Sequence, residues 1–288
     1  MRIEVNGVRI FFDVEGAKLV PDGAVMRERP TLILLHGGPG FDHTSFRPAF
    51  SQFSDIAQVI YIDHRGNGRS DREPRESWTL AQWGDDLQAF CQALEIDKPI
   101  VMGQSFGGMV AMAYATRHPE HPGKLILSST SAAMHRYRAR SVELFEQKGG
   151  AEIGAMARRV LYEGYDSEAT AAEWMTRAMP HYNTTPNTDA DARQRAIMSL
   201  KVLLHFFGPD GECFTFDFID DLAKIRCPTL VLAGEDDPMT PVEAHVDIAA
   251  AIPSQWVRFE RVANAGHGAF RDDPAAYELI RDFILPQA

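Results

Sequence analysis

The sequence feature that most constrains the fold is the pattern G-x-S-x-G at residues 103–107. The residues before it, KPIVM at 98–102, predict a short buried strand, and the residues after it, MVAMAYA at 109–115, predict a helix. A strand that turns sharply into a helix places Ser105 at the tip of a strained turn, with its hydroxyl projecting outward. Such a turn presses together the residues two before and two after the serine, which explains Gly103 and Gly107. It also leaves the amide of Phe106 free at a helix N-terminus, where it can bind a negatively charged oxygen.

The rest of the chain alternates between short apolar runs and longer stretches with helical periodicity. Strands are predicted at 31–35, 58–62, 124–128, 228–233 and 256–259, and helices at 79–94, 242–252 and 273–284. This alternation predicts an α/β fold with a mostly parallel central sheet and helices on both faces. In such sheets ligands bind beyond the carboxyl ends of the strands, and the motifs described below lie there.

Two regions are expected to depart from this alternation. Residues 2–15 predict a hairpin around a two-residue Asn-Gly turn, and residues 16–30 predict a loop. The stretch 131–220 predicts helices without a convincing strand between them, at 141–148, 151–163, 168–179 and 190–207. We therefore expect a core formed by residues 1–130 and 221–288, into which residues 131–220 are inserted as a helical cap, or lid.

Composition restricts the class of protein and of partner. The chain has 288 residues, 45% of them hydrophobic, and a formal net charge of −11 without a Lys/Arg cluster, so no nucleic-acid partner is expected. No run approaches about 18 apolar residues, and the N-terminus lacks the apolar segment of a secretion signal, so no membrane partner is expected. The widely spaced Cys91, Cys213 and Cys227 indicate reduced thiols and a cytoplasmic protein. Oligomeric state is not indicated.

A serine nucleophile needs a general base, and two histidines follow the point where the sheet resumes. His245 lies within a predicted helix, where a packing or surface role is expected. His267 lies in a flexible turn directly after a strand, NAGHG at 264–268, from which a side chain can reach the serine. We therefore predict that His267 is the base, and we call residues 264–268 the histidine loop.

The acid that orients the histidine is expected after the 228–233 strand, where Glu235, Asp236 and Asp237 stand side by side. Spacing alone does not separate these three carboxylates. A second amide donor for a developing oxyanion is expected from HGGPG at 36–40, which we call the glycine loop. His36 itself precedes the nucleophile and is expected to hold this loop by hydrogen bonds. No metal-ligand spacing, dinucleotide fingerprint or phosphate loop occurs, so neither metal nor cofactor is expected.

These residues resemble the α/β-hydrolase superfamily and, within it, the proline iminopeptidase-like branch. HGGPG at 36–40 looks like the branch's oxyanion loop, and DHRGNGRS at 63–70 is similar to its D-x-R-G-x-G-x-S loop. AYATRHPE at 113–120 is similar to the segment that follows the branch's nucleophile. The resemblance covers nearly the whole chain and implies an α/β-hydrolase fold with a helical lid.

Two further motifs carry the remaining roles that the resemblance implies. G-x-x-D-x-x-x-P at 234–241, which we call the acid loop, resembles the superfamily's acid loop and selects Asp237. NAGHG resembles its histidine loop and agrees with His267. The expected arrangement is therefore Ser105 as nucleophile, His267 as base and Asp237 as acid, with the amides of Gly38 and Phe106 as the oxyanion hole.

The nucleophile motif departs from the branch, which usually has G-G-S-W-G-[ST], whereas this chain has G-Q-S-F-G-G at 103–108. That form is closer to general esterases, lactonases and carbon–carbon hydrolases of the superfamily. Aminopeptidases also hold the substrate's ammonium with lid carboxylates; Glu163, Asp166 and Glu173 are candidates, but none matches a family motif. Solvent-facing charges are the expected alternative for each.

The sequence therefore predicts a cofactor-free serine hydrolase that acts through an acyl-enzyme on a small ester, a lactone or an aminoacyl amide. The alternatives are a proline iminopeptidase-type aminopeptidase and a hydrolase of carbon–carbon bonds. A ligand receptor on the same fold is the alternative outside the enzymes, because such a protein can retain the three residues. The partner expected in each case is a small molecule.

Overall fold

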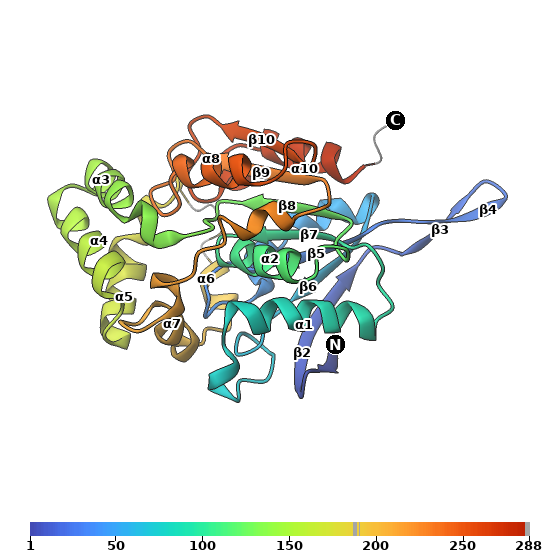
Figure 1. The fold of residues 1–288 in the computed structure, drawn as a ribbon, viewed down its shortest axis with the longest axis horizontal. Helices are drawn as coiled ribbons and strands as arrows, with labels where there is room; N and C mark the ends of the chain where they lie inside the picture. Colours follow the sequence, from blue (N-terminus) through green and yellow to red (C-terminus); the bar gives the residue numbers. More distant parts are fainter. Residues whose placement is uncertain (187–188, 190, 286–288) are drawn as a thin grey trace.

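The computed structural model describes residues 1–186, 189 and 191–285. Their centre is an eight-stranded sheet with the order β1-β2-β6-β5-β7-β8-β9-β10 (Figure 1). The six strands from β6 to β10 in this order are parallel, and β1 and β2 pair antiparallel at one edge. The sheet strands are β1 (Arg2–Val5), β2 (Val8–Glu15), β5 (Thr31–Leu35), β6 (Gln58–Ile62), β7 (Ile100–Gln104), β8 (Lys124–Ser128), β9 (Thr229–Gly234) and β10 (Val257–Val262).

Helices cover both faces of the sheet, as the continuous apolar runs predict. Along β5, Ile33 and Leu35 belong to one hydrophobic cluster and Leu32 and Leu34 to the other, because successive side chains point to opposite faces. The first cluster packs against α1, α2 and α8, and the second against α9 and α10. These helices are α1 (Leu80–Ala93), α2 (Phe106–Arg117), α8 (Val242–Ala251), α9 (Ala269–Asp272) and α10 (Ala275–Ile284). The predicted architecture, a mostly parallel sheet with helices on both faces, is confirmed.

The N-terminal region confirms one prediction and corrects another. The Asn6-Gly7 turn joins β1 and β2 as expected. The predicted loop at 16–30 is instead a second, two-stranded hairpin of β3 (Leu19–Asp22) and β4 (Val25–Glu28), which projects from the body of the protein (Figure 1). Its strands pair with each other outside the main sheet. Leu19, Val25 and Met26 are exposed, so no core-facing alternation marked these strands in the sequence.

Between β8 and β9, the described residues form helices and short 3-10 turns and contain no strand. The helices gather at one end of the molecule (Figure 1): α3 (Arg138–Gly149), α4 (Ala151–Glu163), α5 (Glu168–Arg177), α6 (Ala192–Arg195) and α7 (Leu200–Phe207). The helix predicted at 190–207 is two helices, because residues 196–199 are not helical; its predicted start, Ala190, lies outside the described residues.

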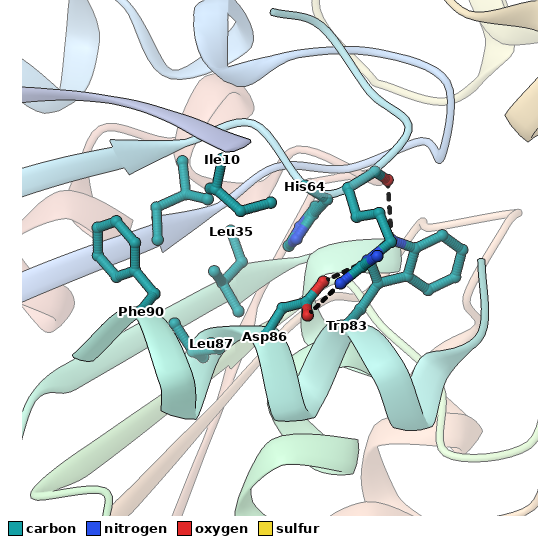
Figure 2. Close-up of a pocket in the computed structure, with 9 residues that line it drawn as sticks. Ile10, Leu35, His64, Trp83, Asp86, Leu87 and Phe90 are labelled. Carbon is teal, nitrogen blue, oxygen red and sulfur yellow. Dashed lines mark hydrogen bonds and ion pairs between the residues drawn. The ribbon is translucent and has the colours of Figure 1, made fainter. Parts of the chain in front are cut away.

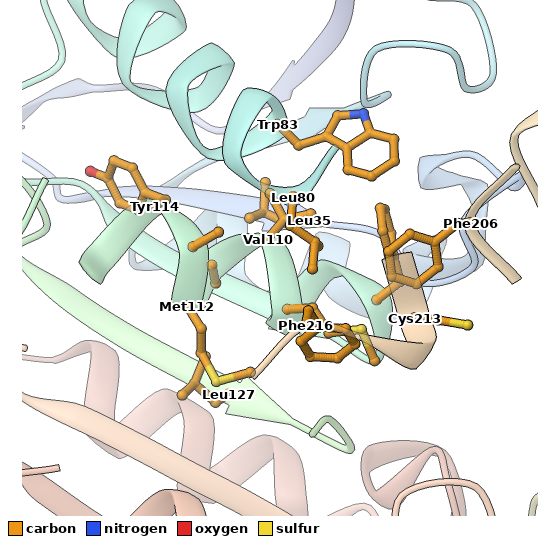
Figure 3. Close-up of a cluster of buried hydrophobic side chains, with 14 of the residues drawn as sticks. Leu35, Leu80, Trp83, Val110, Met112, Tyr114, Leu127, Phe206, Cys213 and Phe216 are labelled. Carbon is orange, nitrogen blue, oxygen red and sulfur yellow. The ribbon is translucent and has the colours of Figure 1, made fainter. Parts of the chain in front are cut away.

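The helical stretch packs into the core of the sheet region. Figure 3 shows Phe206 of α7 and Phe216 in the same buried cluster as Trp83 of α1 and Val110 of α2. Phe206 packs edge-on against Phe106, with ring centroids 5.2 Å apart. Because Phe106 directly follows the predicted nucleophile, this stretch lies close to the strand ends. Within the described part of the chain, no helix is both long and apolar enough to cross a membrane.

Candidate active site

The turn at Ser105 has the strained geometry that the sequence predicts. Ser105 has φ +57° and ψ −121° at the junction of β7 and α2, and its amide donates to the carbonyl of Ser128 at 2.9 Å. A Cβ on Gly103 would lie 2.2 Å from the carbonyl oxygen of Gly107, and one on Gly107 would lie 2.0 Å from that of Leu35. Both positions therefore require glycine, and the crowding at this turn is as predicted.

Three predicted site residues meet at the carboxyl ends of β7, β9 and β10. His267 Nε2 lies 2.9 Å from Ser105 Oγ, and His267 Nδ1 lies 2.8 Å from Asp237 Oδ2. The carboxylate accepts from Nδ1–H, which leaves Nε2 unprotonated and able to accept the proton of the serine. This is the geometry in which a histidine can act as general base toward a hydroxyl.

Asp237 is the carboxylate that reaches His267. Glu235 instead forms an ion pair with Arg261 at the surface, at 2.9 Å. The backbone amide of Asp236 donates to the carbonyl of Ala265 at 2.9 Å. Burial would raise the pKa of the fully buried Asp237, but the nearby His267 and the hydrogen bonds that the carboxylate accepts outweigh it and lower the pKa. The carboxylate is therefore ionised at neutral pH.

Thr240 is a residue of this site that the sequence reasoning missed. Its hydroxyl donates to Asp237 Oδ2 at 2.7 Å and lies 3.3 Å from His267 Nδ1. Its amide and that of Met239 donate to Asp237 Oδ1 at 2.9 and 2.8 Å. A threonine three residues after an aspartate can make such a turn, and this was the available signal.

The glycine loop lies beside the serine. A Cβ on Gly37 would stand 3.3 Å from Ser105 Cβ, and Gly38 has φ +122°, a conformation that favours glycine. Phe106 is the first residue of α2, so its amide has no acceptor within the helix. The two predicted oxyanion donors, the amides of Gly38 and Phe106, thus belong to the two segments that adjoin Ser105.

His36 holds the glycine loop in place. Its Nδ1 donates to the carbonyl of Gly37 at 2.7 Å, and its Nε2 accepts from the amide of His64 at 3.2 Å. This pair of bonds requires a neutral ring, and burial lowers the pKa of His36. The Gly40 amide also donates to Asn67 Oδ1 at 2.6 Å, so residues 63–70 form the scaffold of the loop.

A buried ion pair stands behind this scaffold. Arg65 contacts Asp86 of α1 through two hydrogen bonds of 2.7 Å, and its carbonyl accepts from Trp83 Nε1 (Figure 2). The cavity between this pair and His64 has a volume of about 10 Å³. That is room for about one water molecule, so it is not a substrate pocket.

His245 has the packing role that the sequence predicts. It is fully buried, its Nε2 accepts from the Thr130 amide at 2.9 Å, and its Nδ1 donates to the carbonyl of Pro241 at 3.3 Å. Burial lowers the pKa of His245 to about 4. Thr130 in turn donates its hydroxyl to the Ser105 carbonyl at 2.7 Å, so this histidine links the acid loop to the serine turn.

Aromatic residues of the helical stretch stand against His267. The Tyr182 ring packs edge-on against the imidazole, with centroids 5.1 Å apart, and its hydroxyl accepts from Trp174 Nε1 at 2.8 Å. Phe145 packs against the rings of both Trp174 and Tyr182. Tyr182 is therefore held against His267 by two buried aromatic side chains behind it.

The three carboxylates considered for ammonium binding lie elsewhere. Glu173 pairs with Arg159 and Arg177, each at 2.9 Å, in a groove of about 410 Å³ whose lining includes none of the triad residues. Asp166 is exposed and accepts from side chains at the start of α5, and Glu163 is exposed at the end of α4. Their surroundings match solvent-facing charges.

Comparison with known proteins agrees with this architecture. Residues 30–274 match the family described as alpha/beta hydrolase fold, so the chain belongs to the α/β-hydrolase family. A proline iminopeptidase of Lactobacillus delbrueckii subsp. lactis is 29% identical over 278 residues, which cover 90% of this chain and 92% of that protein. This similarity supports the resemblance to the proline iminopeptidase-like branch that the motifs predicted.

Solved structures extend the likeness in fold to enzymes of different names. The proline iminopeptidase of Mycobacterium smegmatis has a TM-score of 0.78 at 24% identity, over 99% of this chain and 97% of the other. Est816, described as an N-acyl homoserine lactone degrading enzyme, has a TM-score of 0.67 at 24% identity, over 98% and 100%. The family and its relatives support an enzyme that acts on small molecules.

Proposed function

We propose that this protein is a cofactor-free serine hydrolase in which Ser105 is the nucleophile, His267 the general base and Asp237 the orienting acid. The observation that carries the proposal is the continuous pair of contacts, 2.9 Å from Ser105 Oγ to His267 Nε2 and 2.8 Å from His267 Nδ1 to Asp237 Oδ2. In the reaction, Ser105 attacks the acyl carbonyl as His267 takes its proton, and His267 then returns the proton to the leaving group. In the second half of the reaction, water attacks the acyl-enzyme as His267 takes its proton. His267 then returns the proton to Ser105 Oγ as the acid product leaves.

The oxyanion of each tetrahedral intermediate would bind to the amides of Gly38 and Phe106. Two observations support this assignment: the position of the glycine loop beside Ser105, and the helix N-terminus at Phe106. Backbone donors fixed before the reaction stabilise the developing charge without reorganising. We further propose that residues 131–220 are a cap over this site, which the contact of Tyr182 with His267 supports.

The proposed substrate is a small neutral ester or lactone. An aminopeptidase must bind an ammonium group, and a cation removed from water needs a carboxylate partner. Among the described residues, the buried carboxylates already have basic partners at 2.6–2.8 Å: Asp42 with Arg69, Asp63 with His43, Asp86 with Arg65 and Asp237 with His267. The Tyr182 ring, which packs against His267, lines this side of the histidine with an aromatic group and favours an uncharged acyl part.

A proline iminopeptidase-type activity is the second candidate. The observation that favours it is the 29% identity with the Lactobacillus proline iminopeptidase over 90% of this chain. Half-buried Glu212 is a carboxylate of the insertion that is partly enclosed, but it accepts a hydrogen bond from the Leu80 amide of α1 at 2.8 Å. An ammonium site there would have to compete with this bond.

The experiment that tests the mechanism is labelling with a serine-directed fluorophosphonate, together with turnover of short acyl esters. The wild-type protein should be labelled once, and Ser105→Ala should lose both the label and activity, by on the order of 10⁶ in kcat. Ser131→Ala is a matched control, because Ser131 is a buried serine outside the proposed triad. Labelling of Ser105→Ala at the wild-type rate would reject the mechanism, and labelling without turnover of any substrate would favour the ligand receptor.

A further inference from the structure

Three consecutive residues of the inserted stretch 131–220, Tyr182 to Thr184, are each hydrogen-bonded to the histidine loop. The carbonyl of Tyr182 accepts from the amide of His267 itself at 2.8 Å. Asn183 Oδ1 accepts from the amide of Gly268 at 2.7 Å, and the Thr184 hydroxyl donates to the carbonyl of Asn264 at 2.6 Å. The residues on both sides of the imidazole are thus held by a segment from outside the sheet region.

Asp272, at the end of α9, joins the two segments. Its carboxylate accepts from the amide of Gly266 at 2.7 Å and, on the insertion side, from the amides of Thr184 and Thr185 at 3.0 and 3.1 Å. Burial would raise the pKa of Asp272, but the hydrogen bond from the Thr185 hydroxyl and those from these amides outweigh it and lower the pKa. The carboxylate is therefore charged at neutral pH, and charge-assisted hydrogen bonds are the stronger kind.

The shape of the histidine loop fits the same contact. A Cβ on Gly266 would lie 2.1 Å from the carbonyl oxygen of Tyr182 and 2.8 Å from Asn183 Cα. Glycine at this position therefore makes room for the insertion segment, which is a steric observation independent of the hydrogen bonds. Residue 266 is adjacent to His267, so any displacement of the segment acts directly on the backbone that carries the imidazole.

We propose that residues 182–185 and the carboxylate of Asp272 form a clamp that positions His267 against Ser105. The inference rests on the proposed function, because it gives the insertion a part in holding the general base. Asp272 is a positioning residue: it contacts the backbone of the histidine loop and acts through His267. The insertion then contributes to the rate of the chemical steps as well as to the wall around the substrate.

The test compares Asp272→Asn with Asp273→Asn, its neighbour on the chain. Three backbone amides point at the Asp272 carboxylate, and the NH₂ group of asparagine cannot accept from them, so the clamp loses part of its bonding. Within the described part of the chain, the Asp273 carboxylate accepts only from the amide of Ala275, and asparagine can retain that bond. Kinetics use a short acyl ester, and circular dichroism checks folding.

For Asp272→Asn we expect kcat to fall by about 10- to 100-fold with KM within about twofold, because a small misplacement of the base slows chemistry and leaves binding intact. The fluorophosphonate labelling rate should fall by the same factor, and Asp273→Asn should keep both values. Asn183→Ala, which frees the Gly268 amide, is expected to act in the same direction and replaces Asp272→Asn if that variant does not fold.

Wild-type kcat in Asp272→Asn, or in Asn183→Ala where that variant replaces it, would overturn the clamp. So would an equal fall in Asp273→Asn. Ser105→Ala is measured in parallel to separate the two proposals. Activity that persists in Ser105→Ala rejects the proposed function, whereas activity lost there and unchanged in the clamp variants rejects the clamp alone.

Discussion

The acid loop shows how finely the site depends on single residues. Three consecutive carboxylates follow β9, and the backbone turns so that only Asp237 of these points at His267, while Glu235 pairs with Arg261 at the surface. Asp237 is stabilised there by the amides of Met239 and Thr240 and by the Thr240 hydroxyl. A buried carboxylate needs such donors, and its neighbours in the sequence do not have them.

We therefore expect Asp237→Asn to lower kcat by on the order of 10⁴, because an amide cannot hold His267 in the tautomer that accepts the serine proton. Asp236→Asn should change kcat by less than about threefold, since that side chain has no recorded contact with His267 in the described structure. Steady-state kinetics with one ester decide between them. A larger loss of kcat in Asp236→Asn than in Asp237→Asn would show that Asp237 is not the acid.

The sequence was enough to pick out residues that meet in the candidate site where one motif offered a single residue of the required type, as at Ser105 and His267. Asp237 could be separated from Asp236 only by resemblance to known acid loops. Composition and spacing do not show which of two adjacent side chains the turn directs toward His267. Thr240 and Asp272 were missed for a related reason: each acts by a hydrogen bond to a group that only the fold brings near. Nothing in the sequence places residue 272 beside residues 184 and 185.

At the scale of elements, the buried strands were the most predictable part. The runs at 31–35, 58–62 and 124–128 coincide with β5, β6 and β8, because strands buried on both faces are continuously apolar. The β3–β4 hairpin was not predicted from the sequence, because neither of its faces packs against the hydrophobic core. Its available signal was Gly23, which has φ +62° and begins the two-residue turn between the strands.

His245 of α8, which accepts a hydrogen bond from the Thr130 amide just after β8, predicts how the free energy of unfolding depends on pH. His245 is buried with a pKa of about 4, against about 6.5 in an unfolded chain, and it is flanked by Asp237 and His267. Between these values the unfolded state binds more protons, so the free energy of unfolding rises with pH and falls as pH drops from about 6.5 toward 4. The contribution of His245 to that fall is about 2–3 kcal/mol.

We expect His245→Gln to lose less stability over this window than the wild-type protein, because glutamine keeps an acceptor for the Thr130 amide and does not titrate. Urea unfolding at pH 7 and pH 4.5 measures the difference. Other buried histidines, such as His36 and His64, titrate in both proteins and cancel in the comparison. Equal pH slopes for the two proteins would show that His245 is not the group responsible.

At the scale of the whole molecule, the insertion and the sheet region share one hydrophobic cluster. Phe206 and Trp174 belong to it together with Phe106 and Trp83, so the proposed cap is packed against the nucleophile helix. The sequence predicted helices there from their periodicity, but not which face each would present to the site. Under the proposed function those faces would select the substrate, so the substrate class was the least predictable property of the chain.

The last prediction concerns that class. We expect kcat/KM for a short acyl ester to exceed that for prolyl anilide, each divided by its uncatalysed rate, because esters react faster intrinsically. The reason is electrostatic: a substrate ammonium would enter a site bordered by Tyr182 and His267, and the buried carboxylates of the described chain already have basic partners. Without a carboxylate, desolvating the ammonium costs several kcal/mol.

Blocking the prolyl amine with an acyl group provides the control, because it removes the charge and keeps the anilide. If the ester is preferred, blocking should leave the low anilide activity unchanged or raise it. If blocking abolishes a strong anilide activity instead, the insertion holds an ammonium, and Glu212→Gln and Glu173→Gln then identify the carboxylate. Glu212 would be the first candidate in that case, since it is half-buried, burial raises its pKa, and its recorded partner is a single amide rather than an arginine.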